Sequence, residues 1–235
     1  MKRFDPGVRW AKEKIAGWKQ SGDFGPMLSL RIWCGHGAWQ WFREPAINLG
    51  DDKIDYHTPR ESKPDWMTDA SWKDHDWWIN YYSHQTNLAR FVAGEDFHFD
   101  AAKRLDLARF PSYFIPCTFA QSGAHGYLDF AASVHKQWDE GFEVRFARAK
   151  VTAQLPAPLA HGQIAQVTAS EYPREGEARE IRPALDAVDG FASQARQFIA
   201  CIRGQEQPLS PASEAVKEVA FSENLVRYFQ DRAGG

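Results

Sequence analysis

The order in which helical and strand-like segments follow one another constrains the fold of this 235-residue chain more than any other feature. A helical pattern comes first, followed by one strand-like segment, a long segment without periodicity, and a second helix. Several strand-like segments and two more helices complete the chain. A sheet of β-α-β units would need strands and helices in regular alternation, so this order excludes it. It predicts one α+β domain over residues 1–235, with an open, mostly antiparallel β-sheet and helices packed on one face.

Capping residues and apolar spacing locate the helices. Asp5 and Pro6 are typical of a helix start, and Gly22 of a helix end. Further helices are predicted over Trp77–Ala93 and Asp189–Arg203, and a last one opens at Ser210. The two closing helices carry apolar stripes, which are typical of packing on a core: Phe191, Ala195, Phe198 and Ile202 in one, and Val216, Val219, Val226 and Phe229 in the other.

Period-two alternation locates the strands. They are predicted over Met27–Cys34, Tyr127–Val134 and Phe142–Leu155, with a weaker candidate at Gln163–Ala169. In the first of them, one face is expected to carry Leu28, Leu30, Ile32 and Cys34, and the other Ser29 and Arg31.

Tryptophan is concentrated in one part of the chain. Seven of the ten tryptophans fall between residues 33 and 78, in a segment that we interpret as a Trp-rich insertion at about 35–78. Indole faces stack on sugar rings, so Trp33, Trp77, Trp78 and Tyr81 are candidate sugar-binding residues. Packing of a long loop onto the sheet, or a protein interface, explains the same residues equally well.

Composition excludes several classes of partner. A formal net charge of −3 leaves no basic excess to neutralise a phosphate backbone, so nucleic-acid binding is not expected. Apolar runs such as Phe114–Ala120 are too short for a membrane span, and no signal-peptide core follows Met1. Three widely spaced cysteines indicate neither a disulfide framework nor a zinc cage, so the expected location is a reducing cytoplasm.

No motif for a nucleotide cofactor is visible. Gly35-His36-Gly37 begins like a Gly-x-Gly turn, but the third glycine of the dinucleotide fingerprint is missing. A strand-ending turn is the better interpretation, and no P-loop is present elsewhere. The chain alone is therefore expected to bind no cofactor.

A histidine flanked by amides is the main catalytic candidate. On one helix, Asn80, His84 and Asn87 would share a face. His84 could exchange a proton with a substrate hydroxyl, which the two amides would orient. A hydrogen-bonded polar helix face is the alternative.

A metal site is a weaker interpretation. Asp74-His75-Asp76 could bind a metal together with His57 or His84, as in a metal-dependent hydrolase. A solvated acidic loop is the better interpretation of this run, so no metal ligand is predicted.

Several motifs resemble the glucose–fructose oxidoreductase / inositol dehydrogenase (Gfo/Idh/MocA) family. They are Arg3-Phe4-Asp5-Pro6-Gly7-Val8, then Ser21-Gly22-Asp23-Phe24-Gly25 before a strand, and Asn80-x-x-x-His84 followed by Gly94-Glu95. The closing pattern of Phe191–Gly204, Pro208-Leu209-Ser210 and a final helix is also similar, so the resemblance covers nearly the whole chain.

The resemblance implies a fold and a function. The fold is the family's C-terminal domain, an open antiparallel sheet whose outer face often builds a homo-oligomer. The function is oxidation or reduction of a sugar or polyol hydroxyl or carbonyl, dependent on NAD or NADP, with His84 matching the family's catalytic histidine.

The chain departs from the family pattern in two respects. The N-terminal Rossmann domain is absent, and Asn80 stands where the family has aspartate. Asparagine orients a hydroxyl but accepts no proton from it. The leading expectation is a substrate-binding domain that needs a Rossmann domain supplied elsewhere, for example by a partner chain. The alternative is a non-catalytic sugar-binding or assembly subunit.

Overall fold

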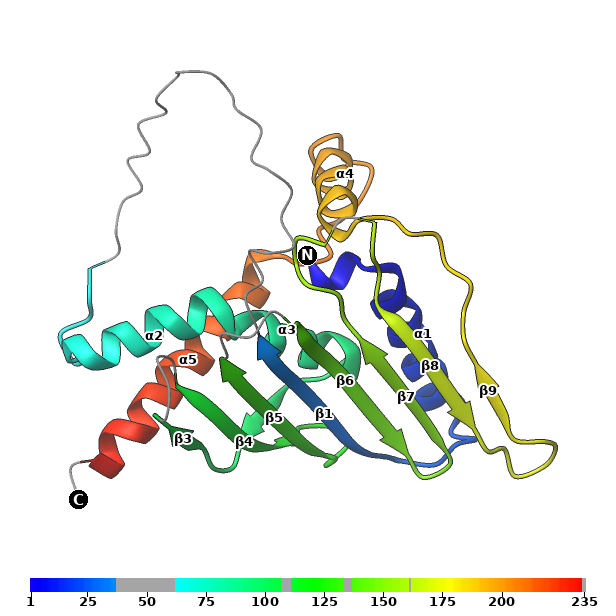
Figure 1. Cartoon of the computed structure of the whole chain (residues 1–235), viewed down its shortest axis with the longest axis horizontal. Helices are drawn as coiled ribbons and strands as arrows, with labels where there is room; N and C mark the ends of the chain where they lie inside the picture. The colour runs from blue at the N-terminus through cyan, green and yellow to red at the C-terminus, as the bar shows by residue number, and fades with distance from the viewer. Residues whose placement is uncertain (37–61, 107–110, 133–136, 161, 234–235) are drawn as a thin grey trace.

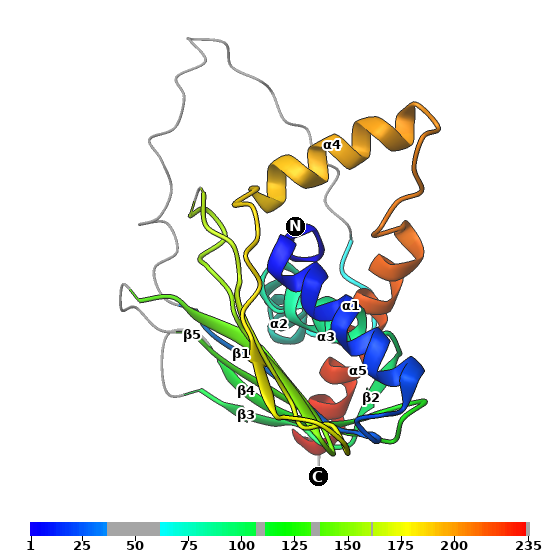
Figure 2. The ribbon, with the colours of Figure 1, turned by 90° about the vertical axis from the view of Figure 1, so that its right-hand side faces the viewer.

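The computed structural model describes residues 1–36, 62–106, 111–132, 137–160 and 162–233 (Figure 1). Within these ranges nine strands form one open sheet, and helices cover one of its faces (Figure 2). The predicted α+β class is thus confirmed. Most of the Trp-rich segment, including Trp39, Trp41 and His57, lies outside the described residues. None of the described helices is both long and apolar enough to cross a membrane.

The first helix follows its sequence signals closely. A short turn, η1 (Lys2–Phe4), leads into α1 (Pro6–Ser21). The Asp5 carboxylate accepts hydrogen bonds from the backbone N–H groups of Gly7 at 2.8 Å and Val8 at 3.1 Å. Gly22 ends the helix with a φ of 69°, which glycine adopts without steric cost.

The helix predicted over Trp77–Ala93 is two helices, α2 (Asp69–Tyr81) and α3 (Ser83–Ala93). Thr68 caps α2, so the helix begins eight residues earlier than its apolar pattern indicates. Ser83 Oγ donates to the Ile79 carbonyl at 2.6 Å, and such side-chain bonds compete with the helical ladder. Asn80 therefore belongs to one helix, and His84 and Asn87 to the next.

The sheet is mixed at its centre and antiparallel elsewhere. The central strand β1 (Met27–His36) pairs in parallel with β5 (His125–Ala132) and antiparallel with β6 (Asp139–Phe146). Beyond β6 lie β7 (Ala149–Gln154), β8 (Gln166–Glu171) and β9 (Arg179–Ile181). Beyond β5 lie β4 (Ser112–Phe119), β2 (Phe97–Phe99) and β3 (Lys103–Leu105). The strand predicted over Phe142–Leu155 is the β6–β7 hairpin.

Strand β4 was not predicted, because Pro116 interrupts its pattern. Proline cannot donate to a sheet ladder, so it argues against a central strand. In the structure β3 pairs with β4 up to Phe114 and β2 pairs from Cys117 onward. Pro116 lies between these two short partners, where its carbonyl accepts from Asp100 N at 3.0 Å. The missing N–H therefore breaks no ladder bond.

The start of β1 differs from the predicted alternation. A register irregularity between Met27 and Ser29 inserts one extra residue opposite β6. Met27 consequently takes the buried position, and Leu28 is 49% exposed rather than on the face of Leu30.

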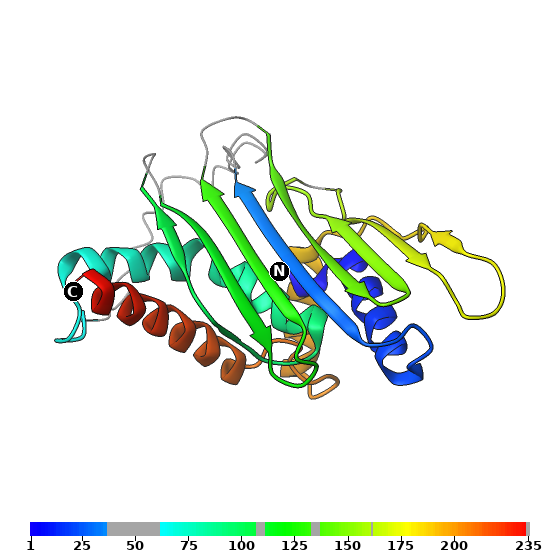
Figure 3. The same cartoon turned by 90° about the horizontal axis from the view of Figure 1, so that it is seen from below.

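The helices lie on the sheet in two groups. Figure 3 shows α2 and α5 (Ala212–Ala233) side by side below the β3–β5 end, and α1 below the other end. In α5 the core contacts come from Phe221, Leu225 and Val226, whereas Val216 and Val219 of the predicted stripe are exposed.

Helix α4 (Gly190–Ile202) forms where it was predicted, with Asp189 as its cap, but none of its residues is buried. The large apolar side chains of this helix are Phe191, Phe198, Ile199 and Ile202, and we call them the α4 face. They are exposed to solvent, and the exposed fraction reaches 66% at Phe198 and 71% at Ile202. In Figure 2 the helix projects above the rest of the helical layer and lies near the N-terminus.

Buried glutamates join the helical layer to the sheet. Glu140 on β6 has no exposed surface and accepts from Lys2 Nζ at 2.5 Å and from Gln85 Nε2 at 2.7 Å. Glu171 on β8 accepts from Trp18 Nε1 at 2.8 Å. Glu218 on α5 forms an ion pair with Arg90 of α3.

The Lys2–Glu140 pair gives a stability prediction. Lys2→Met leaves a carboxylate without its counter-charge at a fully buried position, so the free energy of unfolding should fall by about 3 kcal/mol in urea titrations. Lys63→Met, which breaks an exposed ion pair with Asp69, should change nothing measurable. Adding Glu140→Gln to Lys2→Met should restore part of the loss. Equal stability of wild type and Lys2→Met would contradict the assignment.

Candidate functional site

His84 lies in the first turn of α3, near groups from two other parts of the chain. The charges that act on its ring are those of Lys2, the Met1 amino group and Glu140. Lys2 belongs to η1, and Glu140 lies near the start of strand β6. The buried ion pair between these two residues holds η1 and β6 together. Gln85, the next residue of α3, donates to the same carboxylate. We call His84, Lys2, Glu140 and Gln85 the His84 site.

The surroundings of His84 favour the neutral imidazole. Desolvation by the surrounding protein, together with the positive charges of Lys2 and the Met1 amine, lowers the pKa of His84 to about 4, and Glu140 opposes these effects. The residue is nevertheless exposed, so solvent reaches it. At neutral pH this histidine accepts protons and carries no charge.

The two amides predicted to assist His84 are engaged elsewhere. Asn80 Nδ2 donates back along α2 to the Asp76 carbonyl at 2.8 Å and to Asp76 Oδ1 at 3.1 Å. Asn87 Oδ1 accepts from Arg3 Nε at 2.6 Å, and its Nδ2 donates to Glu218 Oε1 at 3.3 Å. The spacing argument placed all three on one helix, whereas Asn80 lies on α2 and His84 and Asn87 lie on α3. Either amide would have to give up these bonds to hold a substrate.

The aromatic candidates lie in three different environments. Trp78 is 1% exposed and packs in the core against Tyr113 and Phe221, so no face remains for a sugar ring. Trp77 and Tyr81 are half-buried on α2, with ring centroids 3.9 Å apart. The structure thus assigns Trp78 to packing, which corrects its predicted role in substrate binding.

Trp33 lies on the sheet face opposite the helices. Its neighbours Ile32 and Cys34 point into the core, so its own side chain points outward. The indole Nε1 donates to Asp139 Oδ1 at 2.7 Å, and the Arg31 guanidinium lies 5.2 Å from the ring centroid. The ring also covers Gly141, where an added Cβ would lie 2.3 Å from it. Trp33 is therefore not part of the His84 site.

The histidine and carboxylates of Asp74-His75-Asp76 lie on helix α2. His75 is buried, and its Nδ1 lies 2.9 Å from Ser222 Oγ. Successive helical residues point in different directions, so the two carboxylates diverge. In the described part of the chain, no three His, Cys, Asp or Glu side chains gather closely enough to hold a metal ion.

Sequence reasoning named His84 as a candidate, but it did not name Lys2, Gln85 and Glu140, which the structure places around it. The predicted strand began at Phe142, so Glu140 was outside it. A charged residue such as Glu140 does not contribute to an apolar pattern in the sequence. Its burial is possible only because distant segments of the chain supply hydrogen-bond and ion-pair partners. Lys2 does precede the Arg3-Phe4-Asp5-Pro6 motif, which was the one available pointer to this end of the molecule.

Comparison with solved structures identifies the fold. A proposed myo-inositol dehydrogenase from Sinorhizobium meliloti 1021 is 15% identical, with a TM-score of 0.61; the match covers 98% of this chain and 62% of that one. An aldose-aldose oxidoreductase from Caulobacter crescentus, complexed with glycerol, is 18% identical, with a TM-score of 0.60 and coverages of 98% and 60%. A 3-ketoreductase from Actinomadura kijaniata, in complex with TDP-benzene and NADP, is 14% identical, with a TM-score of 0.54 and coverages of 90% and 55%.

Over the part that it spans, the chain has the fold of these oxidoreductases, as the resemblance to the Gfo/Idh/MocA family implies. It spans about 60% of their length, so each contains a substantial part that has no counterpart here. No protein-family model matches the chain, and no curated protein matches it.

The pKa of His84 can be measured directly. We expect the imidazole resonances, assigned with a His84→Gln variant, to titrate with a midpoint near pH 4 by NMR. Because the unfolded histidine protonates near its ordinary pKa of about 6.5, the wild type should lose stability relative to His84→Gln as the pH falls from about 6.5 through 4. A midpoint at or above 6.5 would contradict the proposed environment.

Proposed function

We propose that this chain is the substrate-binding domain of an NAD(P)-dependent oxidoreductase that acts on a hydroxyl or carbonyl of a sugar or polyol. The fold supports the reaction class, and the solved structures with this fold include a proposed myo-inositol dehydrogenase, an aldose-aldose oxidoreductase and a 3-ketoreductase. The observation that carries the proposal is the position of His84, an exposed and neutral histidine beside a buried, charged network.

His84 supplies the acid–base chemistry that this reaction needs. When an alcohol becomes a carbonyl, the hydroxyl proton must pass to a base, and a neutral imidazole can accept it. In the reverse direction the imidazolium returns the proton to the nascent hydroxyl. Desolvation and the positive charge of Lys2 disfavour the charged form of His84, which favours proton return to the substrate.

The nicotinamide cofactor belongs to another part of the assembly in this proposal. Dinucleotide sites use a glycine-rich turn between a parallel strand and a helix. In the described part of the chain β1 and β5 form the one parallel pair, and most of the connection from β1 to the next helix, α2, lies outside the described residues. The sequence after β1 lacks the third glycine of the dinucleotide fingerprint, which supports a cofactor site elsewhere.

The α4 face supports a Rossmann-type partner. It is an apolar helix surface that nothing in the described chain covers, close to the N-terminus. Exposed apolar stripes of this kind mark interaction sites. About 40% of the length of each related solved structure has no counterpart here, so additional chain is available in them to cover an equivalent surface.

The activity test uses the chain with its natural partner. The tagged protein is purified from its source cells with whatever it binds, and NAD(P)H formation is measured with inositol, aldoses and glycerol. His84→Ala should lower kcat by about 100-fold or more, the usual contribution of a general acid–base residue. His98→Ala, an exposed histidine on β2, is the matched control and should change nothing.

Two results would contradict the proposal. One is unchanged turnover in His84→Ala, which would remove His84 from the chemistry. The other is the absence of NAD(P)-dependent turnover with every sugar and polyol tested, in a complex that contains a nucleotide-binding partner.

Asn80 favours a second candidate function, a non-catalytic sugar-binding or assembly subunit. The family's aspartate is replaced by an amide that here bonds to its own helix. Such a subunit would bind a sugar without NAD(P)-dependent turnover, and His84→Ala would leave that binding intact.

We also propose that the outer sheet face forms a homo-oligomer. It bears the exposed rings of Phe114 and Tyr127, stacked with centroids 6.3 Å apart. Sedimentation velocity should give a mass of at least twice 26.8 kDa, and Tyr127→Glu should shift it to the monomer. Val216→Glu, at an exposed apolar residue of helix α5 in the helical layer, should not. A monomeric wild type would disprove the proposal.

A further inference from the structure

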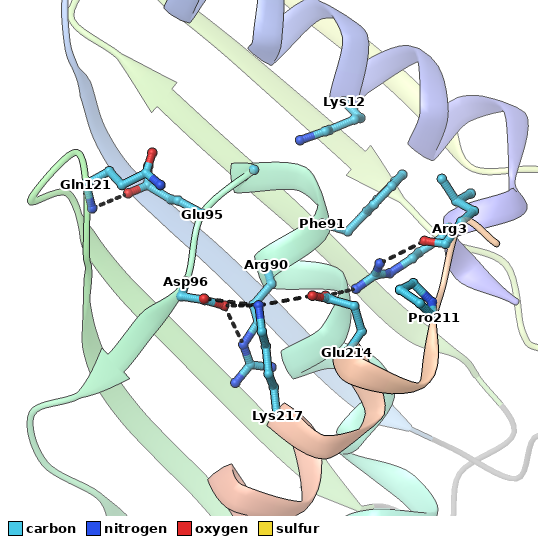
Figure 4. A pocket seen from close by; sticks show the side chains of 12 residues that line it. Arg3, Lys12, Arg90, Phe91, Glu95, Asp96, Gln121, Pro211, Glu214 and Lys217 are labelled. Carbon is cyan, nitrogen blue, oxygen red and sulfur yellow. Dashed lines mark hydrogen bonds and ion pairs between the residues drawn. The ribbon is translucent and has the colours of Figure 1, made fainter. Parts of the chain in front are cut away.

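A pocket of about 410 Å³ lies between α1, α3, α5 and the segment that follows α3 (Figure 4). We call it the Lys12 pocket. The residues that line it include Arg3, Lys12, Phe91, Gln121, Glu214 and Lys217. It has the size of a site for a small molecule. None of these residues belongs to the His84 site.

Each carboxylate that lines the pocket is already paired. Glu214 accepts from Arg3 at 2.9 Å and from Lys217 at 3.0 Å. Asp96 lies 3.1 Å from Lys217 and 3.5 Å from Arg90. Arg90 is paired with Glu218 as well.

Glu95 completes the set of paired carboxylates. It accepts from Lys19 Nζ at 2.5 Å and from the backbone N–H groups of Gln121 at 2.7 Å and Ser122 at 2.8 Å. No carboxylate of the pocket therefore remains to neutralise a further cation.

Lys12 is that further cation. It is half-buried and has no carboxylate within 4.0 Å among the described residues. Figure 4 shows its side chain pointing from α1 into the pocket. The ammonium lies 5.7 Å from the centroid of Phe91, whose ring also carries the Arg3 guanidinium at 5.1 Å. A Cβ on Gly94 would lie 2.6 Å from Lys12 Nζ, so glycine leaves the space that the ammonium occupies.

The surroundings of Lys12 disfavour its charge. Burial lowers the pKa of Lys12, and the positive charges of Lys19 and Arg3 lower it further. A bound anion would reverse this effect, since it supplies the counter-charge that the protein does not.

We propose that the Lys12 pocket binds a small hydroxy acid, whose carboxylate Lys12 bonds. Four cationic and three carboxylate side chains line the pocket, which leaves one positive charge in excess. A single carboxylate balances that charge, whereas a doubly charged phosphate would place surplus negative charge beside Glu95, Asp96 and Glu214.

The remaining polar groups of the pocket suit hydroxyls. The carboxamide of Gln121 makes no hydrogen bond with a described residue, and it can donate to or accept from a hydroxyl. The carboxylates of Asp96 and Glu214 retain lone pairs that accept from hydroxyl groups. A polyhydroxylated acid therefore fits the pocket better than an apolar one.

The test is isothermal titration calorimetry of the whole chain with D-gluconate, with sorbitol and with inorganic phosphate, at low ionic strength. Gluconate should bind one to one, and sorbitol, which has the hydroxyls without the carboxylate, should not bind detectably. Lys12→Met should weaken gluconate binding by at least about 10-fold, the loss of one charge-assisted contact. Lys73→Met, at an exposed lysine on α2, removes the same charge elsewhere and should leave binding unchanged.

Further variants in the same experiment distinguish binding at the Lys12 pocket from binding at the His84 site. His84→Ala should leave gluconate affinity intact, and a loss there would instead place the acid at the His84 site. Circular dichroism must show that Lys12→Met is folded; if it is not, Lys12→Gln and chemical-shift mapping of wild type with gluconate replace it. Absence of gluconate binding, equal binding by Lys12→Met, or tighter binding of phosphate than of gluconate would overturn the proposal.

Discussion

The burial of glutamate side chains between the helices and the sheet is the constraint on which this structure depends. A buried carboxylate is tolerated only when cations and donors surround it, so each one fixes the segments that supply its partners. Glu140 fixes η1 and α3 to β6, and Glu171 fixes α1 to β8. Glu218 fixes α3 to α5 through Arg90, Thr86 and Asn87. The helical layer is thereby held in one arrangement that apolar contacts alone would specify less closely.

Both proposed sites are consequences of this network. The ion pair with Glu140 holds Lys2 near α3, and the positive charge of Lys2 helps to keep His84 neutral. Lys12 lies in the same layer but has no glutamate to pair with, so its charge is left for a ligand. The same structural principle thus produces a proton acceptor at one place and an anion-binding group at another. The α4 face, by contrast, lies outside the network and has no partner within the described chain.

Local signals in the sequence predicted the elements whose causes are local. Asp5, Pro6 and Gly22 bound α1 because caps act on neighbouring backbone groups. The periodicity of α4 gave the helix but could not indicate what covers its stripe, since that is a property of the assembly. Pro116 concealed β4, because its tolerance depends on where β2 and β3 end. The spacing of Asn80 and His84 did not reveal that the Asn80 amide bonds to Asp76. Glu140 was not predicted, because its burial depends on residues that are far away in sequence.

The central claim is that this chain holds the substrate side of an oxidoreductase and leaves the nicotinamide cofactor to a partner. Calorimetric titration of NAD⁺ and NADP⁺ into the isolated chain tests it most directly. The account predicts no saturable heat with either nucleotide, because the sequence contains no Gly-x-Gly-x-x-Gly fingerprint of the kind that holds a pyrophosphate at a helix N-terminus. One-to-one binding with a dissociation constant of about 1 μM, equivalent to roughly −8 kcal/mol, would contradict it and place a cofactor site within this chain.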